Sequence, residues 1–389
     1  MKKVAVVGLG YVGFPLANAL CRAGMSVHGV DTNIELVQTI ESNKDSNLNL
    51  RVSVDYSQIG ESEIVVICVP TPLDEYHKMD LAYLRAAITE TAKYCKNNAT
   101  IVIESTSFVG SLRSFVWPIL KMSGKDLRCG VAPERIDPGN NVWNIKNTPR
   151  LVSGMDEGTT QLICDFYEEI CDNVIKVSSP EVAEAAKLFE NTFRLVNIAL
   201  SMEIASLLQE EGIDFMEVLE AANTKTFGFM PFYPSLGVGG HCIPVDPIYL
   251  NSSFTKNKGG SSLIARALDI NRLRVPQLKS RLETLGLVSH GTLIQILGLG
   301  YKANSSDVRE SSAVHLMILL RKDGYRVEWH DPALNLFDEE ESFPLDRDAA
   351  TWIIGAWNDN FESIDFEKFP GKIITFSDLP LKIGATLIL

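Results

Sequence analysis

The sequence predicts an α/β protein in which two units of alternating strands and helices are joined through a region built on one long helix. Three observations support this prediction. Short apolar runs alternate with amphipathic stretches over residues 3–104, which is typical of a parallel sheet covered by helices on both faces. One helix is predicted from residue 180 to about residue 212, longer than most helices of globular proteins. The pattern of strand, glycine turn and helix then restarts at residue 292.

The first unit is predicted to begin with a strand over residues 3–8 and a helix that ends at Gly24. The elements that follow are strands over residues 26–30, 64–69 and 100–104 and a helix over residues 81–94. These strands are almost continuously apolar, so we expect both faces of the sheet to be buried.

The long helix has a clear start signal, because Ser-Ser-Pro-Glu at residues 178–181 supplies a serine cap and a proline at the first helical position. Its expected core face carries Val182, Ala186, Phe189, Phe193, Val196 and Leu200. A second apolar stripe carries Ala185, Leu188, Leu195, Ala199 and Met202. A helix that is apolar around most of its circumference is expected to be buried between domains or between subunits. Lys187, Asn191 and Arg194 share one narrow polar line on it.

The C-terminal third repeats the beginning of the chain. Gly-Leu-Gly-Tyr occurs at residues 8–11 and again at residues 298–301, each time between an apolar run and a helical pattern. Strands are predicted over residues 292–297 and 326–330. The second turn lacks a third glycine in register, so we do not expect a second dinucleotide site there. The expected regions are therefore residues 1–177, 178–285 and 286–389.

The composition is that of an ordinary globular protein and excludes several classes. The chain has 389 residues, 46% of them hydrophobic, and no window approaches the roughly 18 uninterrupted apolar residues of a membrane span. The formal net charge of −13 argues against nucleic acid or an anionic membrane as a partner. Its 7 cysteines are scattered without a C-x-x-C pair, which argues against a disulfide framework or a metal site and favours the cytoplasm.

Residues 8–13 place a G-x-G-x-x-G pattern between a strand and a helix, and Asp31 ends the next strand. The glycines let the backbone approach a pyrophosphate at a helix N-terminus, and Asp31 can accept hydrogen bonds from a ribose diol. We therefore predict a Rossmann domain that binds NAD rather than NADP. The alternative is a tight structural turn beside an unrelated aspartate. The turn residues expected at the cofactor are Gly8, Gly10, Tyr11, Val12 and Gly13.

The most specific segment is Gly-Val-Gly-Gly-His-Cys-Ile-Pro-Val-Asp-Pro at residues 237–247. Cys242 follows a glycine-rich loop, which suits a thiol held against a ligand that approaches the main chain. The alternative is a buried structural cysteine, and we adopt that interpretation for the other six cysteines. His241 has no partner motif in the sequence, and we expect a structural role for it.

Seven motifs resemble, in this order, those of the UDP-glucose/GDP-mannose dehydrogenase family. They are residues 8–13, 69–72, 104–106, 132–135, the helix with Lys187 and Asn191, residues 237–246 and residues 298–312. The resemblance implies an N-terminal NAD domain, a long central helix through which two copies dimerise, and a C-terminal nucleotide-sugar domain. It also implies oxidation of the C6 hydroxyl of a UDP-hexose to a carboxylate in two hydride transfers.

The catalytic roles are carried over by motif. The resemblance implies that Cys242 captures the C6 aldehyde as a thiohemiacetal, which a second hydride transfer converts to a thioester. It further implies that Lys187 and Asn191 stabilise the oxyanion and that Glu134 is the base for thioester hydrolysis. The residues implied to orient the hydrolytic water are Thr106 and Asp246.

The resemblance also implies the binding residues. Those expected at NAD outside the glycine turn, with Asp31, are Pro70, Thr71, Thr106 and Glu134. Those expected at the UDP-sugar are Arg135, Lys187, Asn191, Phe232, Tyr233, Gly239, Lys302 and Arg309. Lys302 and Arg309 supply the local positive charge that a diphosphate requires in an acidic protein. For Phe232 and Tyr233, ordinary aromatic packing is the alternative.

The substrate is inferred from pattern. Ala-Pro-Glu-Arg-Ile-Asp-Pro-Gly at residues 132–139 resembles the branch that acts on UDP-N-acetylhexosamines. His241 and Pro244 favour UDP-N-acetylglucosamine over UDP-N-acetylmannosamine. UDP-glucose and UDP-N-acetylmannosamine are the alternatives.

Three departures from the family pattern stand out. Val109 occupies a position where many relatives have proline, and Ser235-Leu236 replaces the usual Pro-Gly-Pro approach to the cysteine loop. The strand expected over residues 371–378 lacks an Asp-x-Arg, and Lys372 would not replace the bidentate arginine.

Two other functions fit parts of the sequence. A two-electron dehydrogenase of hydroxyacids or acyl-CoA also places a lysine and an asparagine on a central helix, but it needs neither Cys242 nor a second α/β domain. It would form one NADH per substrate rather than two. A non-catalytic regulator or assembly partner would bind NAD without turning over any UDP-sugar.

Overall fold

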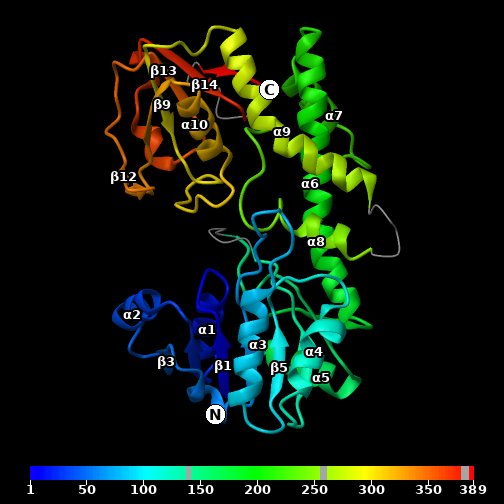
Figure 1. Ribbon diagram of the computed structural model, residues 1–389. Coiled ribbons are helices and arrows are strands. Elements are labelled where there is room, and N and C mark those ends of the chain that lie inside the picture. The colour runs from blue at the N-terminus through cyan, green and yellow to red at the C-terminus, as the bar shows by residue number, and fades with distance from the viewer. Residues whose placement is uncertain (137–141, 255–260, 378–384) are drawn as a thin grey trace. The chain divides into compact units, whose positions relative to one another are not determined.

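The structure is a computed structural model of the chain and describes residues 1–136, 142–254, 261–377 and 385–389. The chain separates into two compact units (Figure 1). The first comprises Met1–Glu190 and Ile248–Lys256, and the second comprises Asn191–Pro247 and Asn257–Leu389. Within the described ranges, no helix is long and apolar enough to cross a membrane.

The first unit is built on a sheet that has eight strands in the described part of the chain, in the order β3-β2-β1-β4-β5-β6-β7-β8. Their bounds are β1 (Lys3–Val7), β2 (Ser26–Val30), β3 (Leu50–Ser53), β4 (Ile64–Ile67), β5 (Thr100–Ile103), β6 (Arg128–Val131), β7 (Arg150–Gly154) and β8 (Val174–Lys176). Neighbouring strands are parallel, except that β6 and β7 are antiparallel. The strand order reverses between β1 and β4, and ligands of such sheets bind at the carboxyl ends of the strands there.

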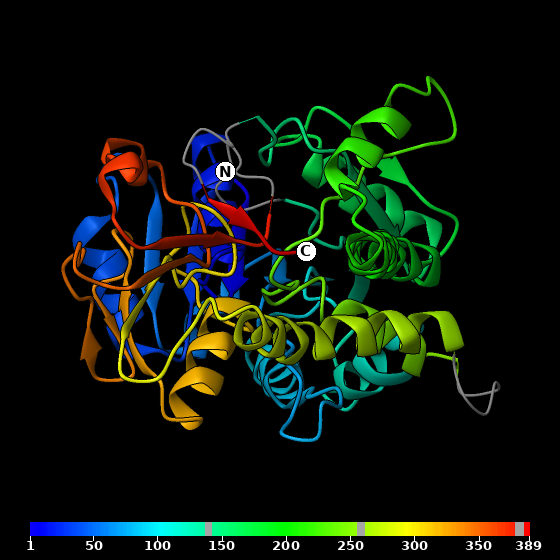
Figure 2. The same cartoon turned by 90° about the horizontal axis from the view of Figure 1, so that it is seen from above.

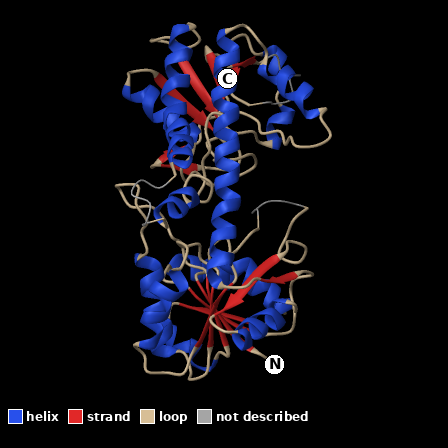
Figure 3. Ribbon diagram, turned by 90° about the vertical axis from the view of Figure 1, so that its right-hand side faces the viewer, coloured by secondary structure: helices blue, strands red, loops and turns tan. Residues whose placement is uncertain are grey.

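Helices cover both faces of this sheet (Figure 3). One face carries α1 (Gly13–Arg22), α2 (Ile34–Asn43) and α5 (Glu157–Tyr167), and the other carries η1 (Tyr56–Glu61), α3 (Ala82–Tyr94), η2 (Leu112–Val116) and α4 (Trp117–Lys121). Val4 and Val6 of β1 belong to the core under α1, whereas Ala5 and Val7 belong to the core under α3. This alternation explains why the strands are apolar at every position.

The second unit combines helices with a smaller parallel sheet of order β10-β9-β13-β14-β15 in its described residues. The strands are β9 (Leu293–Leu297), β10 (Arg326–His330), β13 (Thr351–Ile354), β14 (Lys372–Thr375) and β15 (Thr386–Leu387), and β11 (Leu336–Phe337) pairs with β12 (Glu340–Glu341). The helices are the C-terminal part of α6 (Pro180–Glu210), α7 (Phe215–Asn223), the start of α8 (Asp246–Ser252), α9 (Ser262–Thr284), α10 (Ser312–Lys322), η3 (Asp359–Ser363) and η4 (Phe366–Lys368). Helices α9 and α10 pack on one face of the sheet, and the aromatic residues of η3 and η4 pack on the other.

Within this unit α9 packs beside the C-terminal half of α6. Figure 2 shows α6 in green, viewed almost end-on, with the yellow-green α9 alongside. Leu195 and Ala199 of α6 share a small core with Ala267 of α9. Nearby, Arg266 of α9 forms an ion pair with Glu203 of α6, with Nη2 and Oε1 2.6 Å apart.

The two sheets share one local arrangement at the turn after the first strand of each. The backbone N–H of Leu9 donates to Oδ2 of Asp31 at 2.7 Å, and that of Leu299 donates to Oδ2 of Asp331 at 2.8 Å. Each turn opens with a glycine at positive φ, +89° in the first and +80° in the second. Asp331 is buried, however, whereas Asp31 is half-buried. The second turn therefore presents no accessible carboxylate to a ribose.

The strands and helices predicted from the sequence are confirmed, and their ends differ by at most two residues in all but one case. The exception is the strand expected over residues 371–378, which is β14 and ends at Thr375. The prediction for the faces of α6 is wrong in part. On the stripe that was expected to be the core face, Val182, Phe189, Phe193 and Leu200 are exposed. The second stripe supplies the buried side chains instead, because the chain's own cores cover only one side of the helix. An apolar stripe therefore remains uncovered in the single chain.

Candidate active site

The first part of the site is the glycine turn between β1 and α1. Gly8 has φ +89°, and a Cβ on it would lie 2.7 Å from the carbonyl oxygen of Cys68. A Cβ on Gly13 would lie only 1.8 Å from the carbonyl oxygen of Gly8, so this glycine lets α1 start directly above the turn. By contrast, a Cβ on Gly10 would meet nothing within 4 Å. Space therefore remains beside Gly10 for a ligand that approaches the backbone.

Asp31 follows β2 and lies beside this turn. Its Oδ2 accepts the hydrogen bond from Leu9, and its Oδ1 accepts one from the N–H of Asn33 at 2.9 Å. Both carboxylate oxygens thus accept hydrogen bonds from backbone groups, which fixes the orientation of the side chain. Tyr11 is exposed on the same turn. The glycine turn can accept a pyrophosphate, and the fixed carboxylate beside it can accept hydrogen bonds from a ribose. Together they fit the adenosine diphosphate part of a dinucleotide.

The loops after β4, β5 and β6 carry the next expected residues: Pro70, Thr71, Thr106 and Glu134. The loop after β4 is held by Tyr249, whose hydroxyl donates to the carbonyl of Thr71 at 3.1 Å. Ser105 fastens the loop after β5, because its hydroxyl donates to the carbonyl of Val69 at 2.7 Å. Tyr249 is not among the residues predicted from the sequence, because a single tyrosine in a later helix carries no signal of this contact.

Glu134 is 9% exposed, and its Oε1 accepts a hydrogen bond from the N–H of Ile136. We expected Arg135 at the substrate, but it makes a bidentate ion pair with Glu190 of α6. The Nη2–Oε1 distance is 2.7 Å and the Nε–Oε2 distance is 3.1 Å. Arg135 also donates to the carbonyl of Pro149 at 2.8 Å. The end of this motif, Asp137-Pro138-Gly139, lies outside the described residues.

A buried network that sequence analysis missed lies below these loops. Nη1 of Arg150 is 3.0 Å from Oε1 of Glu104, which also accepts the hydroxyl hydrogen of Tyr167 at 2.5 Å. Arg150 further donates to the carbonyl of Ala132, at the end of β6. Burial alone would lower the pKa of Arg150, but Glu104 and its neighbours raise it. The network fixes the ends of β5 and β6, from which Thr106 and Glu134 extend.

On α6, the residues of the first unit include Lys187 and Glu184, both buried. Glu184 accepts hydrogen bonds from the N–H groups of Gly110 and Leu112, at 2.6 and 2.9 Å, and from the hydroxyl of Ser111 at 2.8 Å. This carboxylate attaches α6 to the segment that follows Thr106. In the same segment, the N–H of Val109 donates to the hydroxyl of Ser253 at 3.0 Å.

In the second unit Asn191 and Asp246 form a buried pair, since Nδ2 of Asn191 donates to Oδ2 of Asp246 at 2.5 Å. The N–H of Asp246 in turn donates to the carbonyl of Cys242 at 2.8 Å. The carbonyl of Cys242 thus accepts a hydrogen bond from the first residue of α8, Asp246. Cys242 itself is half-buried.

The cysteine loop packs directly against residues 301–310. A Cβ on Gly239 would lie 2.5 Å from the carbonyl oxygen of Glu310, and a Cβ on Gly240 would lie 2.7 Å from the ring of Tyr301. Gly240 has φ +84°, and its N–H donates to the carbonyl of Arg309 at 3.0 Å. No side chain would fit at these two positions, because the cysteine loop lies so close to residues 301–310. The contact brings together two motifs that are about 60 residues apart in the sequence.

Arg309 connects the same two segments through side chains. Its Nη2 lies 2.6 Å from Oδ2 of Asp307 and 3.0 Å from Nδ1 of His241. Burial raises the pKa of Asp307, but the hydrogen bonds and charge of Arg309 outweigh it, and the pKa lies below its ordinary value. Lys302 lies over the ring of Tyr301, with Nζ 5.7 Å from its centroid. His241, for which we expected a structural role, therefore has a polar partner in Arg309.

The remaining expected substrate residues are less clearly placed by contacts. Phe232 packs edge-to-face on Phe193, with ring centroids 5.7 Å apart, and Tyr233 is 48% exposed. Lys372, in the C-terminal strand, donates to the carbonyl of Gly286 at 2.5 Å. Among the described residues, no group of three His, Cys, Asp or Glu side chains could hold a metal ion.

A Rossmann unit with a fixed aspartate beside its glycine turn defines an NAD-binding α/β protein, and the second sheet with its cysteine loop narrows the class to an oxidoreductase with an additional ligand domain. Comparison with protein-family models gives the family directly. Residues 2–171 match the NAD binding domain, residues 181–273 the central domain and residues 295–373 the UDP binding domain of the UDP-glucose/GDP-mannose dehydrogenase family. The chain belongs to this family.

Individual relatives agree with this assignment. The chain is 35% identical to UDP-N-acetyl-D-glucosamine 6-dehydrogenase of Salmonella typhi, over 85% of this chain and 82% of that protein. It is 32% identical to UDP-N-acetyl-D-mannosamine dehydrogenase of Methanocaldococcus jannaschii, over 85% of this chain and 79% of that protein. Among solved structures, UDP-D-ManNAc dehydrogenase from Pyrococcus horikoshii superposes with a TM-score of 0.86 at 28% identity, covering 96% of this chain and 94% of that one.

Proposed function

We propose that this nucleotide-sugar dehydrogenase oxidises the C6 hydroxyl of UDP-N-acetylglucosamine to the carboxylate, in a four-electron reaction that uses the thiol of Cys242. The observation that carries the proposal is the contact between the cysteine loop and residues 301–310 within the second unit. This contact joins the loop of the thiol to the segment that carries Lys302 and Arg309, the cations that we assign to the diphosphate.

The glycine turn of the first unit has enough space for the pyrophosphate of NAD. The turn has room beside Gly10, while Gly8 and Gly13 could carry no side chain. We assign the pyrophosphate to Gly8, Gly10, Tyr11, Val12 and Gly13, the ribose to Asp31, and the nicotinamide end to the loops with Pro70, Thr71, Thr106 and Glu134. When bound, NAD supplies the hydride acceptor for each oxidation.

The chain's own residues would perform the remaining chemistry. After the first oxidation, the Cys242 thiolate adds to the C6 aldehyde, and the carbonyl oxygen becomes the oxyanion of a thiohemiacetal. Lys187 and Asn191 stabilise that oxyanion by charge and hydrogen bonding. This addition is needed because only the tetrahedral carbon can lose a second hydride, which leaves a thioester on sulfur.

Hydrolysis of the thioester completes the cycle. Glu134 accepts a proton from a water molecule that attacks the thioester carbonyl, and the thiolate of Cys242 leaves. Thr106 and Asp246 orient the water. The short contact of Asn191 with Asp246 and the backbone bond of Asp246 to Cys242 support a shared role for these three residues.

Binding of the sugar nucleotide is assigned mainly to the second unit. We assign the diphosphate to Lys302 and Arg309, and contacts with the rest of the ligand to Arg135, Lys187, Asn191, Phe232, Tyr233 and Gly239. We choose N-acetylglucosamine as the sugar because of the sequence pattern over residues 132–139 together with His241 and Pro244. UDP-glucose and UDP-N-acetylmannosamine are the competing substrates. We retain residues 1–177, 178–285 and 286–389 as the proposed functional regions.

We also propose that two copies pair through α6. The support is its uncovered apolar stripe, in which Phe189 is 64% and Leu200 54% exposed. Such a stripe is costly in water and is typical of a surface that another chain covers. All 7 cysteines are free thiols, and we propose the cytoplasm, where thiols stay reduced, as the site of action.

The proposal is tested by supplying NAD with each of UDP-N-acetylglucosamine, UDP-N-acetylmannosamine and UDP-glucose and by measuring NADH and product mass. We expect the fastest acid formation from UDP-N-acetylglucosamine, and loss of acid formation in Cys242→Ser. The matched control is Cys164→Ser, which changes a cysteine of α5 and should leave the rate unaltered. Undiminished acid formation by Cys242→Ser would overturn the covalent mechanism, and a clear preference for another sugar would overturn the substrate assignment.

A further inference from the structure

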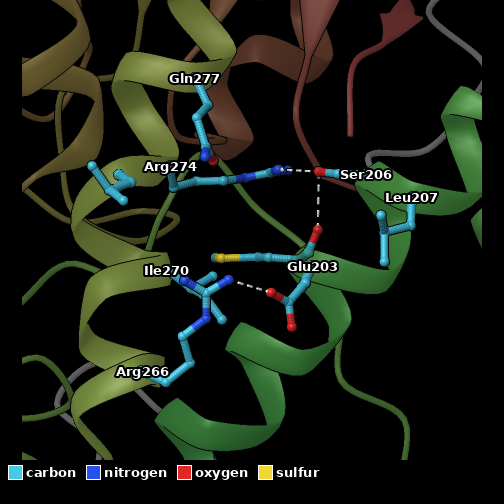
Figure 4. Close-up of a pocket in the computed structure, with 9 residues that line it drawn as sticks. Glu203, Ser206, Leu207, Arg266, Ile270, Arg274 and Gln277 are labelled. Carbon is cyan, nitrogen blue, oxygen red and sulfur yellow. Dashed lines mark hydrogen bonds and ion pairs between the residues drawn. The ribbon is translucent and has the colours of Figure 1, made fainter.

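A buried arginine on α9 plays no part in the chemistry described so far. Arg274 is 2% exposed and lies between α9 and α6 (Figure 4). Its Nε donates to the carbonyl of Ser235 at 3.1 Å, and its Nη1 donates to the hydroxyl of Ser206 at 3.1 Å. In the described part of the chain, Nη2 has no hydrogen-bond partner, and no carboxylate lies within ion-pair distance of the guanidinium.

This arrangement is unfavourable for the stability of the fold. A buried cation without a counter-charge loses its hydration and recovers little of it from two neutral acceptors. Burial, together with the smaller effect of the positive charge of Arg281, lowers the pKa of Arg274 to about 10. A side chain such as methionine would fill the same space without this penalty. The presence of an arginine at this position therefore needs another reason, which we find in the groups that it hydrogen-bonds.

The carbonyl that Arg274 binds belongs to the approach to the cysteine loop. Ser235 stands directly after Pro234 and two residues before Gly237. The ring of Pro234 fixes φ at that residue only, whereas Ser235 and Leu236 have no such constraint. A hydrogen bond from a buried guanidinium to the carbonyl of Ser235 supplies one.

A second residue of α9 holds the same loop three positions earlier on the helix. Oδ1 of Asn271 accepts the N–H of Val238 at 2.7 Å, and Nδ2 of Asn271 donates to the carbonyl of Val238 at 3.0 Å. Asn271 thus satisfies both backbone groups of one loop residue. The loop is fixed to α9 at Ser235 and at Val238, shortly before Cys242.

The opposite end of the guanidinium is fixed as well. The hydroxyl of Ser206 accepts a hydrogen bond from Nη1 of Arg274 (Figure 4). It donates one to the carbonyl of Met202 at 3.1 Å. The hydroxyl is therefore oriented by α6 before it receives the arginine. Two helices and the loop are joined by one side chain.

We propose that Arg274 and Asn271 are positioning residues for Cys242, and that Arg274 is retained at the expense of fold stability because it fixes the backbone ahead of the thiol. This inference rests on the proposed role of Cys242. It predicts that the effects of removing the cation on rate and on stability differ. The rate of acid formation falls while the fold becomes no less stable, whereas loss of an ordinary structural residue would lower both.

The test is Arg274→Met, with Arg266→Met as the matched control on the same helix. Arg266 is largely exposed and paired with Glu203, so its loss should alter neither rate nor stability. For Arg274→Met we expect a melting temperature equal to or above that of the wild type, unchanged NAD affinity, and kcat for acid formation reduced about tenfold to a hundredfold by misplacement of the thiol. The rate of alkylation of Cys242 by iodoacetamide should change in Arg274→Met and not in Arg266→Met.

Asn271→Leu provides a second, independent variant, and we expect a loss of kcat in the same direction with NAD affinity unchanged. A normal kcat in Arg274→Met would overturn the inference and leave the proposed function intact. A parallel loss of stability and rate in Arg274→Met would also overturn it, because Arg274 would then be an ordinary structural residue. Failure of the proposed function is recognised separately, by full acid formation in Cys242→Ser.

Discussion

Asn191 and Asp246 are joined by a 2.5 Å hydrogen bond from Nδ2 to Oδ2, and both side chains are more than nine-tenths buried. Asp246 also receives its position from Cys242, whose carbonyl accepts the N–H of Asp246 at 2.8 Å. A carboxylate thus stands at the first turn of α8, where a negative charge is favoured by the helix N-terminus. The pair links α6 to the cysteine loop inside the second unit.

We expect Asp246→Asn to lower kcat for acid formation by about a hundredfold, since a charged group that orients water is replaced by a neutral one of the same shape. NAD affinity should be unchanged, because the glycine turn lies in the other unit. Steady-state NADH formation and NAD titration by fluorescence would check both expectations. Asp269→Asn, at an exposed ion pair with Arg272, is the control. A normal kcat in Asp246→Asn would contradict the assigned role.

Gly10 and Gly13 should respond differently to the same substitution. Gly13→Ala places a methyl group 1.8 Å from the carbonyl oxygen of Gly8, so it should lower the melting temperature and abolish NAD binding. Gly10→Ala meets no atom of the chain within 4 Å, so the fold should keep its stability while NAD binding weakens about tenfold or more. Thermal melts and NAD titration of both variants check this. Wild-type NAD affinity in Gly10→Ala would show that the pyrophosphate does not approach that glycine.

Two glutamates on the first turns of α6 should give opposite pH dependences. Burial is the largest effect on Glu184 and raises its pKa above 4.5, against hydrogen bonds from Leu112, Ser111 and Gly110. Burial also acts on Glu181, but hydrogen bonds, including that of Arg113, outweigh it and lower its pKa. A folded state with a raised carboxyl pKa binds more protons than the unfolded state, so its stability falls as pH rises through the interval above 4.5. A lowered pKa has the reverse effect below 4.5.

The measurement is urea unfolding of the wild type, Glu184→Gln and Glu181→Gln between pH 4 and 7. The free energy of unfolding of the wild type minus that of Glu184→Gln should decrease as pH rises above 4.5. For Glu181→Gln the difference should increase as pH rises toward 4.5 and then stay constant. If the free-energy differences of the two variants changed with pH in the same way, the opposite pKa shifts of these carboxylates would be contradicted.

Much of the fold follows from the sequence because apolar periodicity and glycine turns are local signals. The strands flanking residues 8–13 and 298–301, and the length of α6, were predicted on that basis. The exposed stripe of α6 was assigned to the core, because a periodic pattern does not say whether the covering surface belongs to the same chain. Leu200 illustrates this, since it fits the core pattern and is 54% exposed.

Contacts between distant residues could not be predicted in the same way. The sequence identified Cys242 and Arg309 as members of separate motifs, but not that Gly239 and Gly240 pack against the second motif. It gave no signal for Tyr249 or Arg274, because a single hydrogen bond to a backbone carbonyl leaves no pattern of spacing. Such contacts depend on the tertiary structure alone.

The exposed stripe of α6 predicts the oligomeric state. Leu200→Glu introduces a charge into the surface that we propose a second copy covers, and it should convert the dimer to a monomer. Met122→Glu is the control, because Met122 is 87% exposed and lies outside the stripe. Sedimentation velocity distinguishes the two states. A wild-type monomer, or a dimer unaffected by Leu200→Glu, would contradict pairing through this helix.

The central claim is that one enzyme removes four electrons from C6 by way of a covalent sulfur intermediate. The ratio of NADH formed to UDP-sugar consumed, measured at completion with NAD in excess, tests it most directly. The account predicts a ratio of two for the wild type, with the uronic acid as the product. A ratio of one, with an aldehyde or ketone as the product, would contradict it.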